Sequence, residues 1–203
     1  MDKDSLVNYW KDSGMITDER VIKVFLEIPR EDFILPEFKG QTYDDRPLPI
    51  LKGQTISQPT TVVIMLQALE LRKEDIVLEI GTGSGYNAAL LSRLCKEVYT
   101  AEIIPELIEF ARRNLSGYKN VHIIQDNGSL EFGRKFDRII ITAACPKIPE
   151  PLVKQLKDGG VIVAPIGPCD SQKLIKAIKE PSGLKTQDLG GFMFVPMKGE
   201  FGY

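Results

Sequence analysis

The stretch Val77-Leu-Glu-Ile-Gly-Thr-Gly-Ser-Gly-Tyr86 is the most informative segment of the chain, because three local patterns meet in it. Val77–Ile80 is a short, mostly apolar run, which is typical of a buried strand in a parallel sheet. The three glycines that follow at alternate positions leave the inner curve of a tight turn without side chains. Apolar residues at helical spacing then run over Asn87–Leu94. A strand, a glycine loop and a helix in this order let backbone N–H groups approach a cofactor closely.

The spacing of the glycines indicates the type of cofactor. A dinucleotide-binding fingerprint has glycines at the first, third and sixth positions, and the sixth position here is Tyr86. The pattern Glu79-x-Gly81-x-Gly83-x-Gly85 instead resembles the first motif of class I S-adenosylmethionine methyltransferases. This resemblance implies that the glycines form the cofactor loop. Glu79 is then expected either to hold this loop or to meet the positively charged end of the cofactor.

Strand-like and helix-like patterns alternate along the rest of the chain. Strands are predicted at Ile76–Ile80, Glu97–Glu102, Val121–Ile124, Arg138–Thr142 and Val161–Pro165, the last of these after a turn at Gly159-Gly160. Helices are predicted between them at Asn87–Leu94, Pro105–Asn114 and Pro149–Leu156. Residues 172–180 and 189–195 predict two further strands, a C-terminal hairpin. The alternation predicts the α/β class, with a doubly wound, mostly parallel sheet and helices on both faces.

The region before the sheet predicts an N-terminal helical addition. Helices are expected at Leu6–Lys11 and Asp18–Ile28, with Thr17 as the N-cap of the second. The second helix ends at Pro29, and its apolar face consists of Val21, Val24, Phe25 and Ile28. A further helix is expected at Pro59–Leu71. Residues 33–58 form a long segment rich in Pro, Gly and polar residues, and long ordered loops are usually functional.

Length and composition bound the function classes. The 203 residues fit one domain, with helices and a substrate-side loop in residues 1–58 and a cofactor-binding core in residues 59–203. The net charge of −2 and the lack of a dense Lys/Arg cluster disfavour nucleic acid as a partner. No apolar run approaches the ~20 residues of a membrane span, and the N-terminus does not resemble a signal peptide. Three scattered cysteines predict a reducing, cytoplasmic compartment with neither disulfides nor a metal site, and a monomer is expected.

Acidic residues follow two of the predicted strands. Ligands of open α/β sheets bind outside the carboxyl ends of the strands. Glu102 ends the second predicted strand, where its carboxylate can accept hydrogen bonds from the two hydroxyls of a ribose. Asp126 follows the third, where it can accept a hydrogen bond from an adenine amino group, and Asn127-Gly128 after it predicts a turn.

A second motif lies upstream of the glycines, and it names a family. Asp45-Arg-Pro-Leu-Pro-Ile50 and Gly53-Gln-Thr-Ile-Ser-Gln-Pro59 together resemble the signature of protein-L-isoaspartate (D-aspartate) O-methyltransferases. The resemblance covers roughly residues 20–197, and its other matching segments are Val77–Leu91, Phe136–Ala144, Gln155–Gly160, Val163–Gly167 and Phe194–Met197.

The resemblance implies site residues at matching positions. The active-site serine of the family matches Ser57, which is expected to orient the acceptor carboxylate without becoming a covalent nucleophile. Thr55 and Val195 are expected to contact the peptide substrate. The family commonly has Gly-Asp-Gly where this chain has Gln125-Asp126-Asn127, a departure that affects how adenine would pack.

The implied reaction transfers a methyl group from S-adenosylmethionine to the free α-carboxylate of an L-isoaspartyl residue, which starts protein repair through a succinimide. Since a carboxylate with a pKa near ~3.5–4 is already ionised at neutral pH, neither a strong base nor a metal is required. The single histidine, His122, is expected on a buried strand in a structural role, and Cys145 is expected to be inert.

Other readings remain open on the sequence. One is a class I methyltransferase that acts on a nucleic acid or another small molecule, although Thr142-Ala-Ala-Cys-Pro146 does not match the Asn/Asp-Pro-Pro-aromatic motif of amino-group nucleic-acid methyltransferases. Another is a binding module that has lost activity, and a third is a nicotinamide oxidoreductase, which Tyr86 at the sixth position disfavours.

Overall fold

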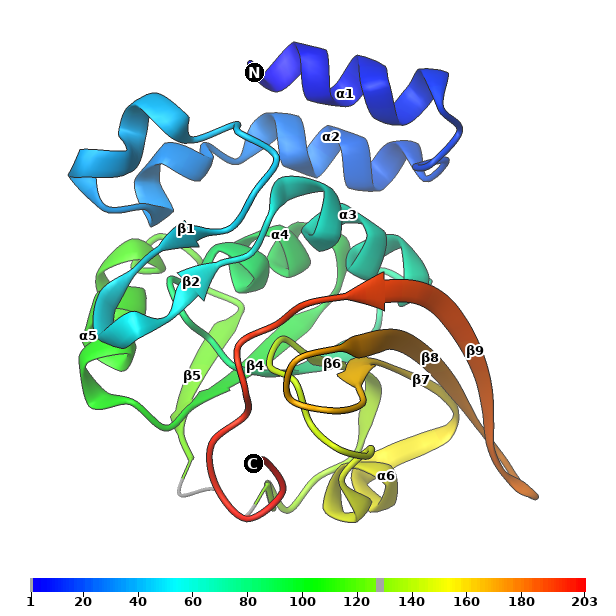
Figure 1. Ribbon diagram of the computed structural model, residues 1–203. Coiled ribbons are helices and arrows are strands. Elements are labelled where there is room, and N and C mark those ends of the chain that lie inside the picture. The colour runs from blue at the N-terminus through cyan, green and yellow to red at the C-terminus, as the bar shows by residue number, and fades with distance from the viewer. Residues whose placement is uncertain (1, 127–129) are drawn as a thin grey trace.

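The fold is a mostly parallel sheet flanked by helices, as a computed structural model that describes residues 2–126 and 130–203 shows (Figure 1). Within this described part, the strands are β1 (Leu48–Pro49), β2 (Thr55–Ile56), β3 (Ile76–Ile80), β4 (Glu97–Glu102), β5 (Val121–Gln125), β6 (Phe136–Ile141), β7 (Leu156–Ile166), β8 (Gln172–Glu180) and β9 (Gly183–Phe192). The α-helices are α1 (Lys3–Asp12), α2 (Glu19–Glu27), α3 (Pro59–Ala68), α4 (Tyr86–Leu94), α5 (Pro105–Asn114) and α6 (Glu150–Gln155). Short 3-10 helices are η1 (Arg30–Phe33), η2 (Pro36–Gln41) and η3 (Leu51–Gly53).

The main sheet has the strand order β5-β4-β3-β6-β7-β8-β9. The first five of these strands are parallel, and β8 and β9 add antiparallel pairs at one edge. The chain proceeds from β3 outward to β4 and β5, and then returns to place β6 on the other side of β3. This reversal creates the topological switch point at which open α/β sheets bind ligands. The prediction of a doubly wound, mostly parallel sheet is confirmed.

Alternate residues of the central strands enter separate hydrophobic clusters on the two faces of the sheet. Val77, Ile140 and Val163 pack with α3, α4 and α5, whereas Leu78 and Ile162 pack with α6. Such strands are apolar on both sides because helices cover both faces, which is why Ile76–Ile80 is apolar with the single exception of Glu79.

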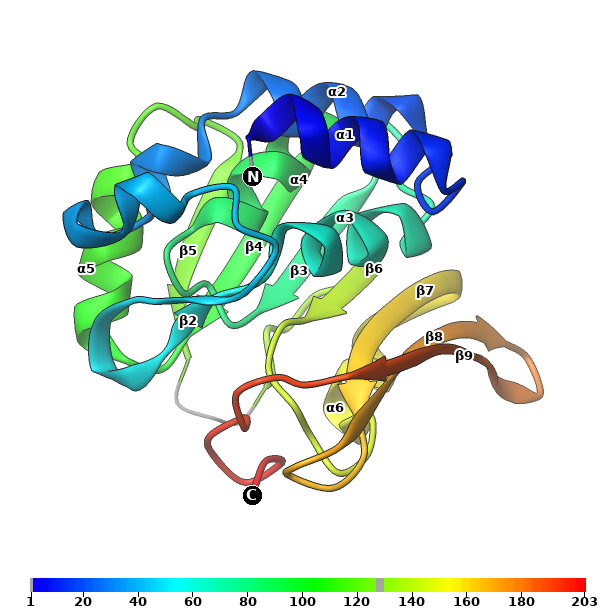
Figure 2. The same ribbon diagram turned by 45° about the horizontal axis from the view of Figure 1, so that its top comes forward.

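The N-terminal helices form an outer layer over α3 and α4, on one side of the sheet (Figures 1 and 2). All four residues of the predicted apolar face of α2 are buried in the same cluster as the helices beneath. The predicted N-cap, Thr17, is wrong: Asp18 caps α2, and its side chain accepts a hydrogen bond from the N–H of Arg20. Asp and Thr are both good caps, and here the backbone N–H groups of Thr17 and Asp18 are instead both bound by Gln67 of α3.

The C-terminal hairpin exists, but one strand and one turn differ from their predictions. The second strand is β9 (Gly183–Phe192) rather than residues 189–195. It is an edge strand with no buried residue, so its sequence has no apolar alternation to detect. Gly159-Gly160 is not a turn before β7 but lies inside it, where the register against β6 shifts between Phe136 and Arg138. Glycines suit such an irregularity for the same reason that they suit turns, since Gly159 has a positive φ of +74°.

The expectation that His122 is buried is also wrong. Its strand, β5, is the edge strand of the sheet, and the imidazole is exposed and stacks on the ring of Tyr99 at 4.7 Å. The predicted turn at Asn127-Gly128 lies outside the described residues. No helix of the described chain combines the length and the apolar character that crossing a membrane requires.

Candidate active site

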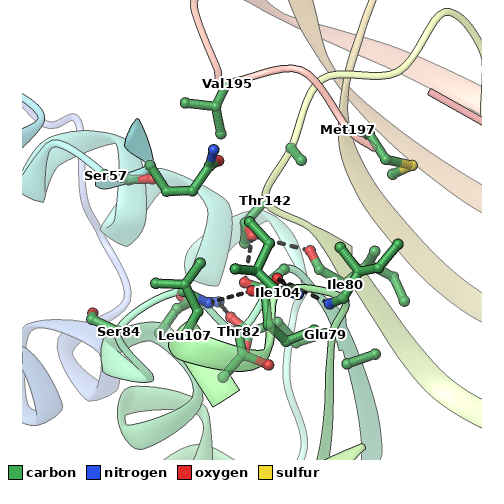
Figure 3. A pocket seen from close by; sticks show the side chains of 18 of the residues that line it. Ser57, Glu79, Ile80, Thr82, Ser84, Ile104, Leu107, Thr142, Val195 and Met197 are labelled. Carbon is green, nitrogen blue, oxygen red and sulfur yellow. Dashed lines mark hydrogen bonds between the residues drawn. The ribbon is translucent and has the colours of Figure 1, made fainter. Parts of the chain in front are cut away.

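A pocket lies at the carboxyl ends of β3, β4, β5 and β6, where the switch point predicts a ligand site (Figure 3). The space inside it, open mouth included, is about 950 Å³. Eight of the nine site residues proposed from the sequence line it, namely Thr55, Ser57, Glu79, Gly81, Gly83, Glu102, Asp126 and Val195. The ninth, Gly85, is not among the lining residues.

The first glycine of the loop is required by close packing. Gly81 has a φ of +97°, and a Cβ at this position would lie 2.5 Å from Oγ1 of Thr142. That hydroxyl donates to the carbonyl oxygens of Ile80 and Gly81, at 3.0 and 2.8 Å. Thr142 therefore attaches the start of the glycine loop to the end of β6. This residue belongs to the site and was not predicted, although its position after a strand of the sheet was a usable signal.

The other two glycines have different roles. The N–H of Gly83 donates to Oε2 of Glu102 at 3.0 Å, so the loop presents its backbone to the acid at the end of β4. A Cβ at Gly83 would meet only Cδ1 of Ile50, at 3.6 Å, whereas one at Gly85 would lie 2.8 Å from Cδ1 of Leu115. Gly85 is thus needed for the packing of α4 against the segment after α5 rather than for the surface of the pocket.

Glu102 organises the backbone around the pocket. Besides the N–H of Gly83, its carboxylate accepts hydrogen bonds from the N–H groups of Ile103 and Ile104, both at 3.0 Å. The residue is 7% exposed. Oε1 accepts two of these bonds and Oε2 accepts one, and since each carboxylate oxygen has two lone pairs, one acceptor position remains on Oε2. Asp126 follows β5, and its N–H donates to the carbonyl oxygen of Glu102 at 2.9 Å, which fixes it beside that acid.

Glu79 is a fully buried acid in the wall of the pocket. Its carboxylate accepts hydrogen bonds from Nδ2 of Asn87 at 2.7 Å and from Oγ1 of Thr100 at 2.6 Å. Burial raises the pKa of Glu79 to about 7, with the nearby Glu102 adding to the effect and the two hydrogen bonds opposing it. A positive charge in the pocket would favour the ionised form of this group.

The opposite side of the pocket is built from segments far apart in the sequence. Thr55 and Ser57 come from β2 and the residues after it, and Val195 comes from the segment after β9 (Figure 3). The carbonyl oxygen of Val195 accepts a hydrogen bond from the N–H of Ala144 at 2.8 Å, which holds the C-terminal segment against the end of β6. The carbonyl oxygen of Ser57 accepts one from the guanidinium of Arg30 at 2.8 Å.

Several lining residues had no sequence signal of their own. Ile103, Ile104 and Leu107 provide an apolar wall after β4, and Met197 and Lys198 come from the C-terminal segment. Apolar residues at the start of a helix are too common for the sequence to single out, and the C-terminal segment reaches the pocket only through tertiary pairing.

The charge of the pocket favours a cation. Among its described lining residues, Glu79, Glu102 and Asp126 carry carboxylates, and Lys198 is the one basic side chain. The described chain has no cluster of three or more His, Cys, Asp or Glu side chains placed to hold a metal ion. A small molecule with a positive charge therefore fits the pocket by its chemistry.

Comparison with known proteins identifies the family. The family model described as protein-L-isoaspartate(D-aspartate) O-methyltransferase matches residues 1–201. The chain belongs to this family. A protein-L-isoaspartate O-methyltransferase of Pyrococcus abyssi is 48% identical over 197 residues, which cover 94% of this chain and 91% of the relative. One from Dictyoglomus thermophilum is 47% identical over 203 residues, which cover 98% and 91%.

Solved structures of the family have the same fold. A putative protein-L-isoaspartate O-methyltransferase of Plasmodium falciparum, in complex with S-adenosyl-L-homocysteine, superimposes with a TM-score of 0.86 at 26% identity, over 98% of this chain and 100% of that one. Another protein-L-isoaspartate O-methyltransferase superimposes with a TM-score of 0.85 at 29% identity, over 99% of this chain and 67% of that one. The protein-L-isoaspartate O-methyltransferase fold therefore extends over nearly the whole chain, N-terminal helices included.

Proposed function

We propose that this protein transfers the methyl group of S-adenosylmethionine to the free α-carboxylate of L-isoaspartyl residues in damaged proteins and peptides. One observation carries the proposal. A single pocket brings the acidic, glycine-lined ends of β3 and β4 opposite the Thr55–Ser57 segment, in a chain that belongs to the family over almost its full length. The whole chain is proposed to act as one unit, a cytoplasmic monomer, with residues 1–58 on the substrate side and residues 59–203 on the cofactor side.

The charge of the pocket suits S-adenosylmethionine. The Plasmodium falciparum relative binds the demethylated product of this cofactor. When bound, the cofactor supplies an electrophilic methyl group on a positively charged sulfonium. We assign the ribose hydroxyls to the carboxylate of Glu102, the adenine amino group to Asp126, and the close backbone approach to Gly81 and Gly83. Glu79 is placed to balance positive charge from within the wall of the pocket.

Thr55, Ser57 and Val195 form the acceptor side of the pocket, which needs to orient the substrate carboxylate rather than to activate it. An α-carboxylate is ionised at neutral pH, so Ser57 has only to donate a hydrogen bond that fixes one carboxylate oxygen in line with the methyl group. The exposed His122 lies on β5, and it is not among the residues that line the pocket. Thr55 and Val195 are proposed to contact the peptide backbone on either side of the isoaspartyl residue, which suits loose recognition of many sequences.

Esterification makes repair possible. The ester carbonyl is a better electrophile than the carboxylate, so the backbone nitrogen of the next residue attacks it, methanol leaves, and a succinimide forms. Water then opens the ring without the enzyme, in part to a normal aspartyl residue.

The test is methyl transfer to a synthetic peptide that contains one isoaspartyl residue. The control is the same peptide with a normal aspartyl residue. We expect the gain of one methyl group on the isoaspartyl peptide alone, detected by mass spectrometry, followed by a succinimide. Transfer to nucleic acid or to a small molecule, with none to the isoaspartyl peptide, would favour a different class I methyltransferase. Binding of S-adenosyl-L-homocysteine without transfer to any acceptor would favour an inactive module.

A further inference from the structure

Arg30 is a buried cation that contacts the acceptor side of the pocket without lining the pocket itself. It begins η1 and is 0% exposed. Its Nε donates to the carbonyl oxygen of Thr42 at 3.0 Å, and its Nη2 donates to the carbonyl oxygen of Ser57 at 2.8 Å. Both acceptors are backbone groups of the segment that leads to the proposed catalytic serine. The guanidinium therefore fixes where the backbone of this segment runs.

The same guanidinium contacts the cofactor side. Its Cζ lies 5.0 Å from the centroid of the Tyr86 ring, a cation–π contact. Tyr86 is the first residue of α4, directly after Gly85, and it is 2% exposed and lines the pocket. Arg30 thus touches Ser57 on one side and the end of the glycine loop on the other. Arg30 lies 27 positions before Ser57 and 56 positions before Tyr86, so it links segments that are far apart in the sequence.

A role in simple packing does not explain this arrangement. Burial lowers the pKa of Arg30, which reflects the cost of keeping the charge away from water. Its Nη1 and the hydroxyl of Tyr86 are both buried and make no hydrogen bond of normal geometry in the described structure, so that only their mutual electrostatic attraction offsets the loss of water. An apolar side chain would fill the space without these costs. A guanidinium differs from an apolar side chain in having several N–H donors in a rigid plane, which can bind two carbonyl groups at once.

We propose that Arg30 is a positioning residue for methyl transfer, which holds the backbone of Ser57 at a fixed place relative to the glycine loop. The proposal rests on the proposed function, because it assigns Arg30 to the acceptor side of that same reaction. Arg30 does not touch the reacting atoms. It acts through Ser57, and its removal should harm the use of the peptide more than the binding of the cofactor.

The chain offers a matched control in Arg138, a second buried arginine that holds backbone carbonyls. Arg138 is 6% exposed and donates to the carbonyl oxygens of Leu69, Asp137 and Glu70 at 2.8, 2.9 and 3.1 Å. Neither Arg138 nor any of these partners lines the pocket. Replacing each arginine by lysine keeps the charge but removes the fork.

The experiment compares R30K and R138K, each assayed below the temperature at which its circular dichroism changes. For R30K we expect kcat on the isoaspartyl peptide to fall about 10- to 100-fold and KM for the peptide to rise. Its Kd for S-adenosyl-L-homocysteine, measured by calorimetry, should stay within about threefold of the wild type. For R138K we expect kcat and both affinities close to those of the wild type, with any loss confined to thermal stability.

Two outcomes would overturn the proposal. One is an equal loss of kcat in R30K and R138K, which would make Arg30 a general structural residue. The other is a loss of S-adenosyl-L-homocysteine affinity in R30K as large as its loss of kcat, which would place Arg30 on the cofactor side. Failure of the proposed function is distinguishable from both, because it would appear in the wild type as no methyl transfer to the isoaspartyl peptide.

Discussion

The two sides of the pocket are constructed in different ways. On the cofactor side, the functional groups follow consecutive strands within one βαβ arrangement, and they bind one another directly, as Gly83 binds Glu102. On the acceptor side, Thr55 and Ser57 precede the sheet and Val195 follows it. Their backbones are held by tertiary contacts, Ser57 by Arg30 and Val195 by Ala144. The cofactor side is a local motif, and the acceptor side is assembled from the two ends of the chain.

This difference predicts how each side responds to substitution. A change on the cofactor side should alter the affinity for S-adenosyl-L-homocysteine, because the groups there bind the loop and are proposed to bind the ligand as well. A change on the acceptor side should alter turnover and leave that affinity in place. An acceptor-side variant that loses affinity for S-adenosyl-L-homocysteine would show that the two sides are energetically coupled.

The largest effect is expected for G81A. The added Cβ would lie 2.5 Å from Oγ1 of Thr142, at a φ of +97° that side chains rarely adopt. We expect binding of S-adenosyl-L-homocysteine to be lost in calorimetry and the free energy of unfolding to fall by more than about 2 kcal/mol. The matched control is G83A, which also has a positive φ (+55°) but whose Cβ would meet only Ile50 at 3.6 Å, so that binding should be weakened but still measurable. Equal behaviour of the two variants would contradict the packing argument.

The second prediction concerns the acceptor side. S57A should lower kcat on the isoaspartyl peptide by about 10- to 1,000-fold, or about 1–4 kcal/mol of barrier, because a hydrogen bond that orients an ionised acceptor is lost. The affinity for S-adenosyl-L-homocysteine should barely change. The pH profile of kcat should show no limb near ~6.5, since no histidine base takes part. A covalent adduct on Ser57 would refute the orienting role, as would a limb that disappears in H122A.

The third prediction tests the buried acid of the cofactor side. The pKa of Glu79 is raised from its ordinary 4.5 to about 7, so between these values the folded protein holds a proton that the unfolded chain has released. The free energy of unfolding should therefore fall as pH rises from 5 to 8, by about 2–3 kcal/mol from this group. E79Q should remove this part of the slope in denaturant titrations, because an amide does not titrate in this range. The amide oxygen of the new side chain can still accept the hydrogen bond from Nδ2 of Asn87. A slope unchanged in E79Q would mean that Glu79 is ionised throughout.

The smallest effect is expected for E102A. Loss of charge-assisted hydrogen bonds to the ribose should weaken the binding of S-adenosylmethionine by about 1–3 kcal/mol. The N–H groups of Gly83, Ile103 and Ile104 lose their acceptor as well, so the loop should become less ordered. The control is E109A, which removes an exposed acid of α5 that pairs with Arg112 and should leave the affinity unchanged. Similar affinities in the two variants would remove Glu102 from the binding site.

The bounds of several helices and strands could be predicted from the sequence, because short local patterns mark them. The burial of a strand could not, because it depends on where the strand lies in the sheet. The bounds of β3, β4, α5 and β8 match their predictions, because apolar runs, glycines and prolines mark their ends. His122 was misplaced because periodicity does not tell an edge strand from a central one. The strand predicted at residues 189–195 failed for the same reason, since β9 lies at the opposite edge with no buried residue.

For the site, the sequence by itself determined the groups that follow β3 and β4. An acid, spaced glycines and a strand-end acid in this order predict that these groups lie together, since parallel strands bring their carboxyl ends to one edge of a sheet, where ligands of such folds bind. Only the tertiary structure decided the rest. Thr142 contacts Gly81 across 61 positions of sequence, and Gly85 packs against Leu115 across 30. Arg30 holds the backbone of Ser57 across 27 positions. Contacts at such distances depend on how whole elements pack, which no local pattern encodes.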